Sequence, residues 1–235
     1  MLSIIGREEY WRWIDERIVT PARHDLKTIQ DAYILSELAS VKGKKILEVG
    51  GGNSRIAALL AHNNEVWLAD GFEGKDGGPG EIPQIPNVKM IQAYLGDYPD
   101  QLPDNYFDVV FSISVVEHIP QPKYIDFTKD SARVLKSGGL AIHAIDIYLY
   151  DNADFNPSSK FQQKRIELYL KTADETGGVL TWTAVPELTE RQTITSSAAY
   201  NSMETLIAWN KFAPSIIKMR AEAVSCSLKM KLMKR

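Results

Sequence analysis

The sequence has a single cysteine, no long apolar run and little excess charge of either sign. Cys226 alone can form neither an internal disulfide nor a cysteine-rich zinc site, which favours a reducing compartment, and we expect the cytoplasm. No apolar run approaches the ~18 residues of a membrane span. The apolar stretch at the N-terminus is too short for a signal peptide, and charged residues follow it at once. We therefore expect no membrane-spanning segment.

The charge balance argues against one class of partner. The 235 residues contain 27 Lys and Arg against 30 Asp and Glu, a net charge of −3. A non-specific nucleic-acid binder would need a strongly basic surface, so we expect no nucleic acid as partner. The composition, 44% hydrophobic and 24% charged, is that of an ordinary globular protein. The length fits one domain of enzyme size.

Strand-like and helix-like patterns alternate in the middle of the chain. Such alternation predicts parallel βαβ units, and hence an α/β fold with a Rossmann-like, doubly wound, mostly parallel sheet and helices on both faces. Ligands of these sheets bind beyond the carboxyl ends of the strands. The expected strands are 45–49, 65–70, 88–91, 107–112 and 140–147, with helices at 56–62 and 125–135.

The two flanks of this core have different patterns. Residues 1–42 predict an N-terminal helical cap, residues 43–148 the core, and residues 149–235 a lid or insertion with C-terminal strands that complete the same domain. The tail, 224–234, alternates apolar and polar residues, which is typical of an edge strand whose lysines protect against aggregation. Helices are expected at 8–17, 26–38, 160–171 and 202–212, and a further strand at 179–185.

A glycine run follows the first core strand. Gly50, Gly51 and Gly52 can adopt positive φ and let a ligand approach the backbone, and the helix that follows offers unpaired N–H groups. A dinucleotide fingerprint would also need glycine at position 55, which is Arg55. Glu48, just before the turn, would repel a pyrophosphate and attract a cation. We interpret this pattern as favouring a sulfonium cofactor with an amino acid head group.

Asp70 ends the next strand, 22 residues after Glu48. This spacing is typical of an acidic residue that accepts hydrogen bonds from the two ribose hydroxyls of an adenosine. The alternative is a surface aspartate that caps the turn before Gly71. Taken together with the glycine run, the ribose role is favoured.

Three segments carry a family resemblance. KILEVGGGNS at 45–54 resembles the first motif of class I S-adenosylmethionine-dependent methyltransferases. LPDNYFDVVFSISVVEHI at 102–119 and ARVLKSGGL at 132–140 resemble later motifs of the small-molecule branch of that family. The resemblance covers about 43–148. It implies a seven-stranded sheet whose last strand, plausibly 224–234, is antiparallel, and S-adenosyl-L-methionine as cofactor.

The resemblance also implies the role of individual residues in cofactor binding. The glycine run and Glu48 would line the methionine part, Asp70 would hold the ribose, and two serines at the end of the fourth core strand would face the cofactor. Family members often have Gly-Asp after the third strand, where this chain has Ala-Tyr, so Asp97 becomes a candidate for the adenine contact. The full cofactor set is Glu48, Gly50, Gly51, Gly52, Asp70, Gly71, Phe72, Tyr94, Ser112 and Ser114.

Methyl transfer to oxygen needs positioning, desolvation and usually a general base. His118 follows the fourth core strand and Asp146 ends the fifth, so both are candidate catalytic residues. His143 is an odd number of residues from Asp146 and should point to the opposite face, as a core histidine. Nothing in the spacing of His118, Asp146 and Glu117 requires a metal, and we expect none.

The flanks should determine the acceptor, because they can fold over the cofactor edge as a lid. We predict a methyltransferase acting on a small molecule or a glycan precursor, with oxygen as the preferred target. A non-catalytic subunit that binds the same cofactor is the main alternative, and an NAD(P)-dependent oxidoreductase is a weaker one. The aromatic candidates for acceptor contacts are Tyr10, Trp11, Trp13, Tyr150, Phe155, Phe161 and Trp182.

Overall fold

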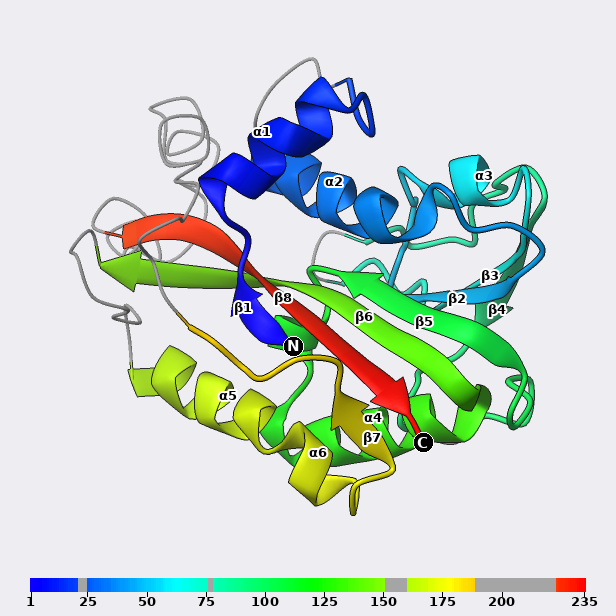
Figure 1. Ribbon diagram of the computed structural model, residues 1–235. Helices are drawn as coiled ribbons and strands as arrows, with labels where there is room; N and C mark the ends of the chain where they lie inside the picture. Colours follow the sequence, from blue (N-terminus) through cyan, green and yellow to red (C-terminus); the bar gives the residue numbers. More distant parts are fainter. Residues whose placement is uncertain (21–24, 76–77, 151–159, 189–222) are drawn as a thin grey trace.

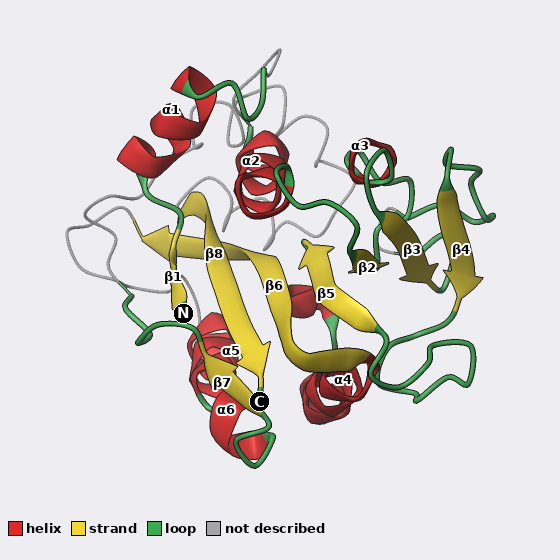
Figure 2. Ribbon diagram, turned by 45° about the vertical axis from the view of Figure 1, so that its right-hand side comes forward, coloured by secondary structure: helices red, strands yellow, loops and turns green. Residues whose placement is uncertain are grey.

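The structure is a computed structural model that describes residues 1–20, 25–75, 78–150, 160–188 and 223–235. The helix predicted at 202–212 lies outside these residues. Within them, one mixed sheet runs through the centre of the molecule and helices cover both of its faces (Figures 1 and 2). This arrangement confirms the predicted α/β class.

The sheet has the strand order β1-β8-β6-β5-β2-β3-β4, and β7 also pairs with β8. The pairs β5–β6, β2–β5, β2–β3 and β3–β4 are parallel, whereas β8 runs antiparallel to β6. The predicted antiparallel last strand is therefore confirmed. The strands are β1 (Leu2–Ile4), β2 (Lys45–Val49), β3 (Glu65–Asp70), β4 (Val88–Gln92), β5 (Phe107–Ile113), β6 (Leu135–Tyr150), β7 (Leu180–Trp182) and β8 (Ala223–Lys234).

Helices α1, α2 and α3 lie on one face of the sheet, and α4, α5 and α6 lie on the other (Figures 1 and 2). The longest element of the first face, α2, begins where the side chain of Asp25 accepts a hydrogen bond from Thr28 N at 2.9 Å, a cap that contributes about 1 kcal/mol. The helices are α1 (Arg7–Asp15), α2 (Leu26–Leu38), α3 (Ala57–Leu60), α4 (Gln121–Val134), α5 (Lys160–Leu170) and α6 (Thr172–Glu175), with a 3₁₀ turn, η1 (Val116–His118), after β5.

Side-chain alternation along the strands builds one hydrophobic core on each face. On β6, Ile142 and Ala144 pack into the core under α1, α2 and α3, whereas Ile145 and Ile147 pack into the core above α4 and α5. Asp146, two residues from Ala144, therefore lies on the α2 face. This alternation decides which polar residues can meet at the carboxyl edge of the sheet.

The prediction that the tail forms an edge strand was wrong. β8 is an interior strand, because β6 lies on one side of it and β1 and β7 lie on the other. Its lysines do not guard an open edge: Lys229 forms an ion pair with Glu9, and Lys231 Nζ lies 2.6 Å from Glu37 Oε2. Carboxylates from α1 and α2 therefore neutralise these lysines, which line the polar face of the strand.

The prediction of a purely helical N-terminal segment was also wrong at its start. Leu2–Ile4 forms strand β1, which pairs antiparallel with β8. Leu2 is fully buried in the core on the α4 face. Two other elements are shorter than predicted: α3 ends at Leu60, where a turn follows, and β7 covers only Leu180–Trp182.

Candidate cofactor and acceptor site

The glycine loop after β2 needs glycine for both its conformation and its space. Gly50 and Gly52 have φ of +64° and +51°, in the left-handed region that glycine favours. A Cβ atom on Gly50 would lie 2.6 Å from Cγ2 of Val115, and one on Gly52 would lie 2.9 Å from Cδ of Pro79. The loop is thus held tightly between the segment after β5 and the loop after β3.

Glu48, at the carboxyl end of β2, has a buried carboxyl group. The residue is 2% exposed, and its Oε2 atom has no hydrogen-bond partner among the described residues. Burial raises the pKa of Glu48 to about 7, although Ser54 and Arg55 act in the opposite direction. A buried acceptor atom of this kind is costly unless a ligand or water satisfies it. An unpartnered carboxylate oxygen is compatible with the predicted cationic ligand, which stays a prediction.

Asp70 ties two loops together at the carboxyl end of β3. Its Oδ2 accepts a hydrogen bond from Gly52 N at 3.0 Å, and its Oδ1 accepts one from Phe72 N at 2.8 Å. Each oxygen of a carboxylate can accept two hydrogen bonds, so each has the capacity for one more, for example from a hydroxyl. The geometry is compatible with the predicted ribose contact. The bond from Phe72 N is the turn cap that the sequence offered as the alternative, whereas the bond from Gly52 N was not predicted.

Tyr94 covers the backbone beside Asp70. A Cβ atom on Gly71 would lie 2.1 Å from the Tyr94 hydroxyl oxygen, so a side chain at that point would displace the Tyr94 ring. Phe72 is buried, whereas Tyr94 is 49% exposed. Asp97, the candidate for the adenine contact, is 56% exposed at its side chain and lies 3.1 Å from Lys123 Nζ. The structure thus places Tyr94, and not Asp97, next to the Asp70 loop.

Ser112 and Ser114, which were expected to act alike, point to different environments. The Ser112 hydroxyl is fully buried and lies 2.8 Å from Nδ1 of His143. Strand alternation turns the Ser112 side chain towards α4. It therefore does not face the expected cofactor site at the carboxyl edge of the sheet. His143 is the core histidine that its spacing from Asp146 predicted, and burial lowers its pKa to about 4.

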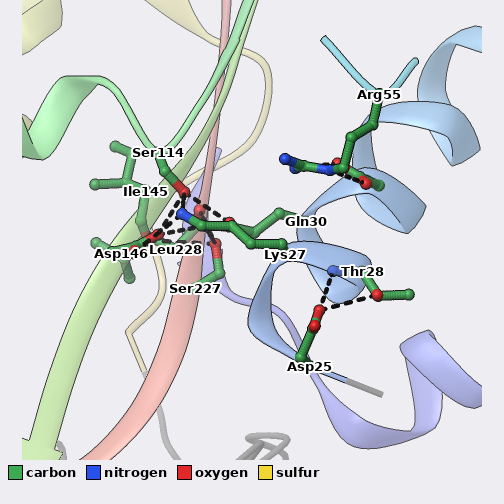
Figure 3. A network of polar contacts seen from close by, with 11 residues as sticks. Asp25, Lys27, Thr28, Gln30, Arg55, Ser114, Ile145, Asp146, Ser227 and Leu228 are labelled. Carbon is green, nitrogen blue, oxygen red and sulfur yellow. Dashed lines mark hydrogen bonds and ion pairs between the residues drawn. The ribbon is translucent and has the colours of Figure 1, made fainter. Parts of the chain in front are cut away.

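Ser114 lies one residue beyond β5 and has φ of +55°, a strained value for a residue other than glycine. Its Oγ lies 2.7 Å from Asp146 Oδ1 and 2.7 Å from Gln30 Oε1. It also accepts a hydrogen bond from Lys27, whose Nζ lies 3.5 Å from Asp146 Oδ2. Figure 3 shows how Lys27 and Gln30 reach from α2 to these two residues. We call Lys27, Gln30, Ser114 and Asp146 the Ser114 cluster.

Sequence reasoning did not find Lys27 and Gln30. They lie three residues apart on α2, which predicts a shared helix face, but polar residues on an amphipathic helix usually face solvent. Gln30 is instead fully buried, and its Nε2 donates hydrogen bonds to Asp146 Oδ1 at 2.7 Å and to Ser227 Oγ at 3.2 Å. Its role depends on β6 and β8 lying beneath α2.

Glu117 and His118 sit together on η1 in contrasting surroundings. Both carboxylate oxygens of Glu117 are buried and have no hydrogen-bond partner among the described residues. Burial, and then the nearby charge of Asp146, holds the pKa of Glu117 well above its usual range. His118 is exposed. Within the described ranges, no group of three or more His, Cys, Asp or Glu side chains is arranged to hold a metal ion.

Most described aromatic candidates for acceptor contacts belong to the interior. Tyr10 and Trp13 are 1% and 4% exposed in the core around α2, and Trp182 packs partly buried against the other core. Trp11 is 45% exposed. Nothing is described of the remaining candidates, which are Phe155 and the side chains of Tyr150 and Phe161.

The core of the chain is similar to known methyltransferases. Residues 47–143 match the family model of a methyltransferase domain. An uncharacterized methyltransferase of Mycobacteroides abscessus is 30% identical over 137 residues, which are 55% of this chain and 50% of that protein. A ubiquinone biosynthesis O-methyltransferase of Vibrio atlanticus is 27% identical over 135 residues, which are 54% of each protein. The chain thus spans about half the length of the curated relatives it matches.

Solved structures show the same fold over most of the chain. A provisionally named sarcosine dimethylglycine methyltransferase from Galdieria sulphuraria superposes with a TM-score of 0.55 at 18% identity, covering 86% of this chain and 84% of that one. Geranyl diphosphate C-methyltransferase from Streptomyces coelicolor A3(2) gives a TM-score of 0.51 at 11% identity, covering 94% and 88%. These comparisons support the predicted resemblance: residues 47–143 match a methyltransferase domain, and the described residues have the fold of solved methyltransferases. No helix in the described ranges is long and apolar enough to cross a membrane.

Proposed function

We propose that this protein binds S-adenosyl-L-methionine at the carboxyl edge of the sheet and transfers its methyl group to an oxygen atom of a small molecule or glycan precursor. The observation that carries the cofactor assignment is the pair of carboxylates on neighbouring strands. Glu48 offers a buried oxygen without a partner, and Asp70 holds the glycine loop against the loop after β3. Bound there, the cofactor supplies an activated sulfonium methyl group.

The residues of this chain then have distinct tasks. Glu48 and the glycine loop hold the amino acid part, Asp70 the ribose, and Tyr94 covers the adenosine side. Val115, against which Gly50 packs, keeps the loop close to the end of β5. The acceptor would lie over the ends of β5 and β6, next to the Ser114 cluster.

Oxygen as the target is supported by the carboxylate of Asp146, which lies within β6 next to the residue that follows β5. Asp146 is in contact with the ammonium of Lys27 and the hydroxyl of Ser114, a polar setting suited to a hydroxyl that must lose its proton. Two relatives are named as O-methyltransferases, the ubiquinone biosynthesis enzyme of Vibrio atlanticus and a fatty-acid O-methyltransferase of Mycolicibacterium smegmatis. Asp146 and the exposed His118 are the proposed candidates for the proton acceptor.

Calorimetry with S-adenosylhomocysteine tests the cofactor site. We expect micromolar affinity that falls about tenfold or more in Asp70→Ala, because the ribose contact and the loop are both lost. Asp100→Ala, an exposed aspartate beyond β4, is the control and should bind as the wild type does. Binding of NADH in place of the thioether would refute the proposal.

Transfer is tested separately from binding. The protein is incubated with methyl-labelled donor and a set of hydroxylated metabolites, including sugar nucleotides and phenols. We expect label in an ether product, and its loss in Asp146→Asn with cofactor affinity retained. Thioether binding without any labelled product would favour the non-catalytic binding subunit. The cytoplasmic location stays a prediction.

A further inference from the structure

The Ser114 cluster combines residues in or next to the core strands with residues of a helix that lies outside the segment matched by the family model. Ser114 follows β5 and Asp146 lies within β6, whereas Lys27 and Gln30 belong to α2, which precedes the matched residues 47–143. Four polar side chains from α2, the β5 end and β6 meet at the edge where the acceptor is expected (Figure 3). Packing alone does not require four polar side chains to meet at this point, so we consider what chemical role they could have.

The hydroxyl of Ser114 is held between a cation and an anion. Lys27 donates a hydrogen bond to Oγ, and Asp146 Oδ1 lies 2.7 Å from the same atom. The positive φ of Ser114 is a strained conformation that a structure keeps where neighbouring contacts enforce it. An alcohol placed between an ammonium and a carboxylate loses its proton more readily, because the ammonium stabilises the oxyanion and the carboxylate accepts the proton.

The charges around this point make Lys27 the cation available to an acceptor. Among the described residues, Asp146 on β6 and, beyond it, Glu117 on η1 are the acidic groups that interact with Lys27. The nearby cation Arg55 is engaged elsewhere, because its Nε and Nη2 lie 2.6 Å and 2.7 Å from the two oxygens of Asp31. The Lys27 side chain is 39% exposed and that of Asp146 is 10% exposed, so Lys27 is the more accessible of the two.

We propose that Lys27 is a catalytic residue that binds the hydroxyl oxygen of the acceptor, at a position next to Ser114 Oγ, and stabilises that oxygen as its proton moves to Asp146. The proposal rests on the proposed function and specifies its acceptor as a hydroxyl compound. The acceptor oxygen forms a bond to the methyl carbon as the sulfur–methyl bond breaks. The products are an ether and a neutral thioether, and the proton leaves Asp146 for solvent. A protonated amine would be repelled by Lys27, so the cluster disfavours that acceptor class.

The first test compares Lys27→Gln, Lys27→Arg and the wild type, with the hydroxyl compound that the labelling experiment shows to be methylated. We expect Lys27→Gln to lower kcat about 10²-fold to 10³-fold, the usual cost of removing one donor to a developing oxyanion. The rate should recover as pH rises through the pKa of the acceptor hydroxyl, and Lys27→Arg should restore part of it. Affinity for S-adenosylhomocysteine should change less than about twofold.

Lys136→Gln is the matched control. Lys136 is also 39% exposed and also pairs with an aspartate, Asp108, at 3.1 Å, but it lies at the amino ends of the strands. It should keep the wild-type kcat and pH profile. An unchanged kcat and pH profile in Lys27→Gln would overturn the role of Lys27.

A second test does not depend on knowing the acceptor. The protein saturated with S-adenosylhomocysteine is titrated with 4-nitrophenol, whose ionised form is coloured. We expect the wild type to lower the pKa of the bound phenol by about one unit, and Lys27→Gln to abolish this change, while Lys136→Gln retains it. A wild type that leaves the phenol unperturbed overturns the inference even where the thioether binds. If S-adenosylhomocysteine does not bind, the proposed function is refuted instead. The phenol titration is then repeated without S-adenosylhomocysteine, and its result tests the role of Lys27 independently.

Discussion

At the scale of single residues, Glu48 combines a cost to stability with a proposed role in cofactor binding. Its carboxyl group is buried at the end of a central strand, and one oxygen lacks a partner among the described residues. Burial raises its pKa from 4.5 to about 7. The folded state therefore binds more protons than the unfolded state between these values, and the contribution of Glu48 to stability declines as pH rises through this window.

Glu48→Gln is expected to stabilise the free protein and weaken the cofactor site. The shift in pKa corresponds to at most about 3 kcal/mol, so we expect a gain of about 1–3 kcal/mol in the free energy of unfolding above pH 7, measured by urea denaturation. Affinity for S-adenosylhomocysteine should fall and lose its dependence on pH near 7. Glu167→Gln, an exposed position on α5, should change neither quantity. A less stable Glu48→Gln at pH 8 would contradict this account.

His143 has the opposite dependence on pH. Burial lowers its pKa from 6.5 to about 4, so the unfolded state binds more protons between these values. Its contribution to stability is therefore present above pH 6.5 and is lost as pH falls towards 4. We expect the slope of unfolding free energy against pH in this window to decrease in His143→Gln. An unchanged slope would show that another group governs the loss of stability in acid.

At the scale of elements, two helices from outside the matched core hold the segment after β5. From one face, α2 contributes Lys27 and Gln30 to Ser114. From the other face, α5 contributes Arg165, a buried residue whose Nη1 donates hydrogen bonds to Ile119 O at 2.5 Å and to Val116 O at 3.4 Å. The turn η1, with Glu117 and His118, is thus held between the two flanks of the chain.

Arg165→Leu should therefore impair methyl transfer more than cofactor binding. Removing a buried charged donor from two carbonyl groups is expected to cost about 2–4 kcal/mol of stability. At a temperature where the variant is folded, we expect kcat to fall at least tenfold with affinity for S-adenosylhomocysteine retained. Lys164→Leu, the exposed neighbour on the same helix, should behave as the wild type. A large loss of thioether affinity with unchanged kcat would contradict this role.

At the scale of the whole molecule, the sheet is completed from both ends of the sequence. β1 from the first residues and β8 from the last pair with each other, with Leu2 opposite Met230 and Ile4 opposite Leu228. Between β8 and the rest of the sheet, β6 forms the longest described ladder, from Leu140 to Tyr150. The flanks are therefore part of the same folded unit as the core in the described residues.

Leu2→Ala tests the contribution of β1. Leu2 is fully buried in the core on the α4 face, so its truncation should lower the free energy of unfolding by about 2–4 kcal/mol. Loss of β1 would also expose part of the β8 edge, and light scattering should show increased association. Glu8→Ala, exposed on α1, should remain within about 0.5 kcal/mol of the wild type. An equally stable Leu2→Ala would show that β1 contributes little.

The class of fold, the positions of the core strands along the chain and the glycine loop could be predicted from the sequence alone, because these depend on local patterns. The glycine run, the acidic residues after β2 and β3 and the alternation of β6 are readable over a few residues, and they placed His143 and Asp146 on opposite faces. Only the tertiary structure decided that β8 is an interior strand, because that depends on β1 arriving from the far end of the chain. It also decided that Lys27 and Gln30 meet Ser114 and Asp146, because contacts between residues more than 80 positions apart depend on how α2 crosses the sheet, which no local pattern specifies.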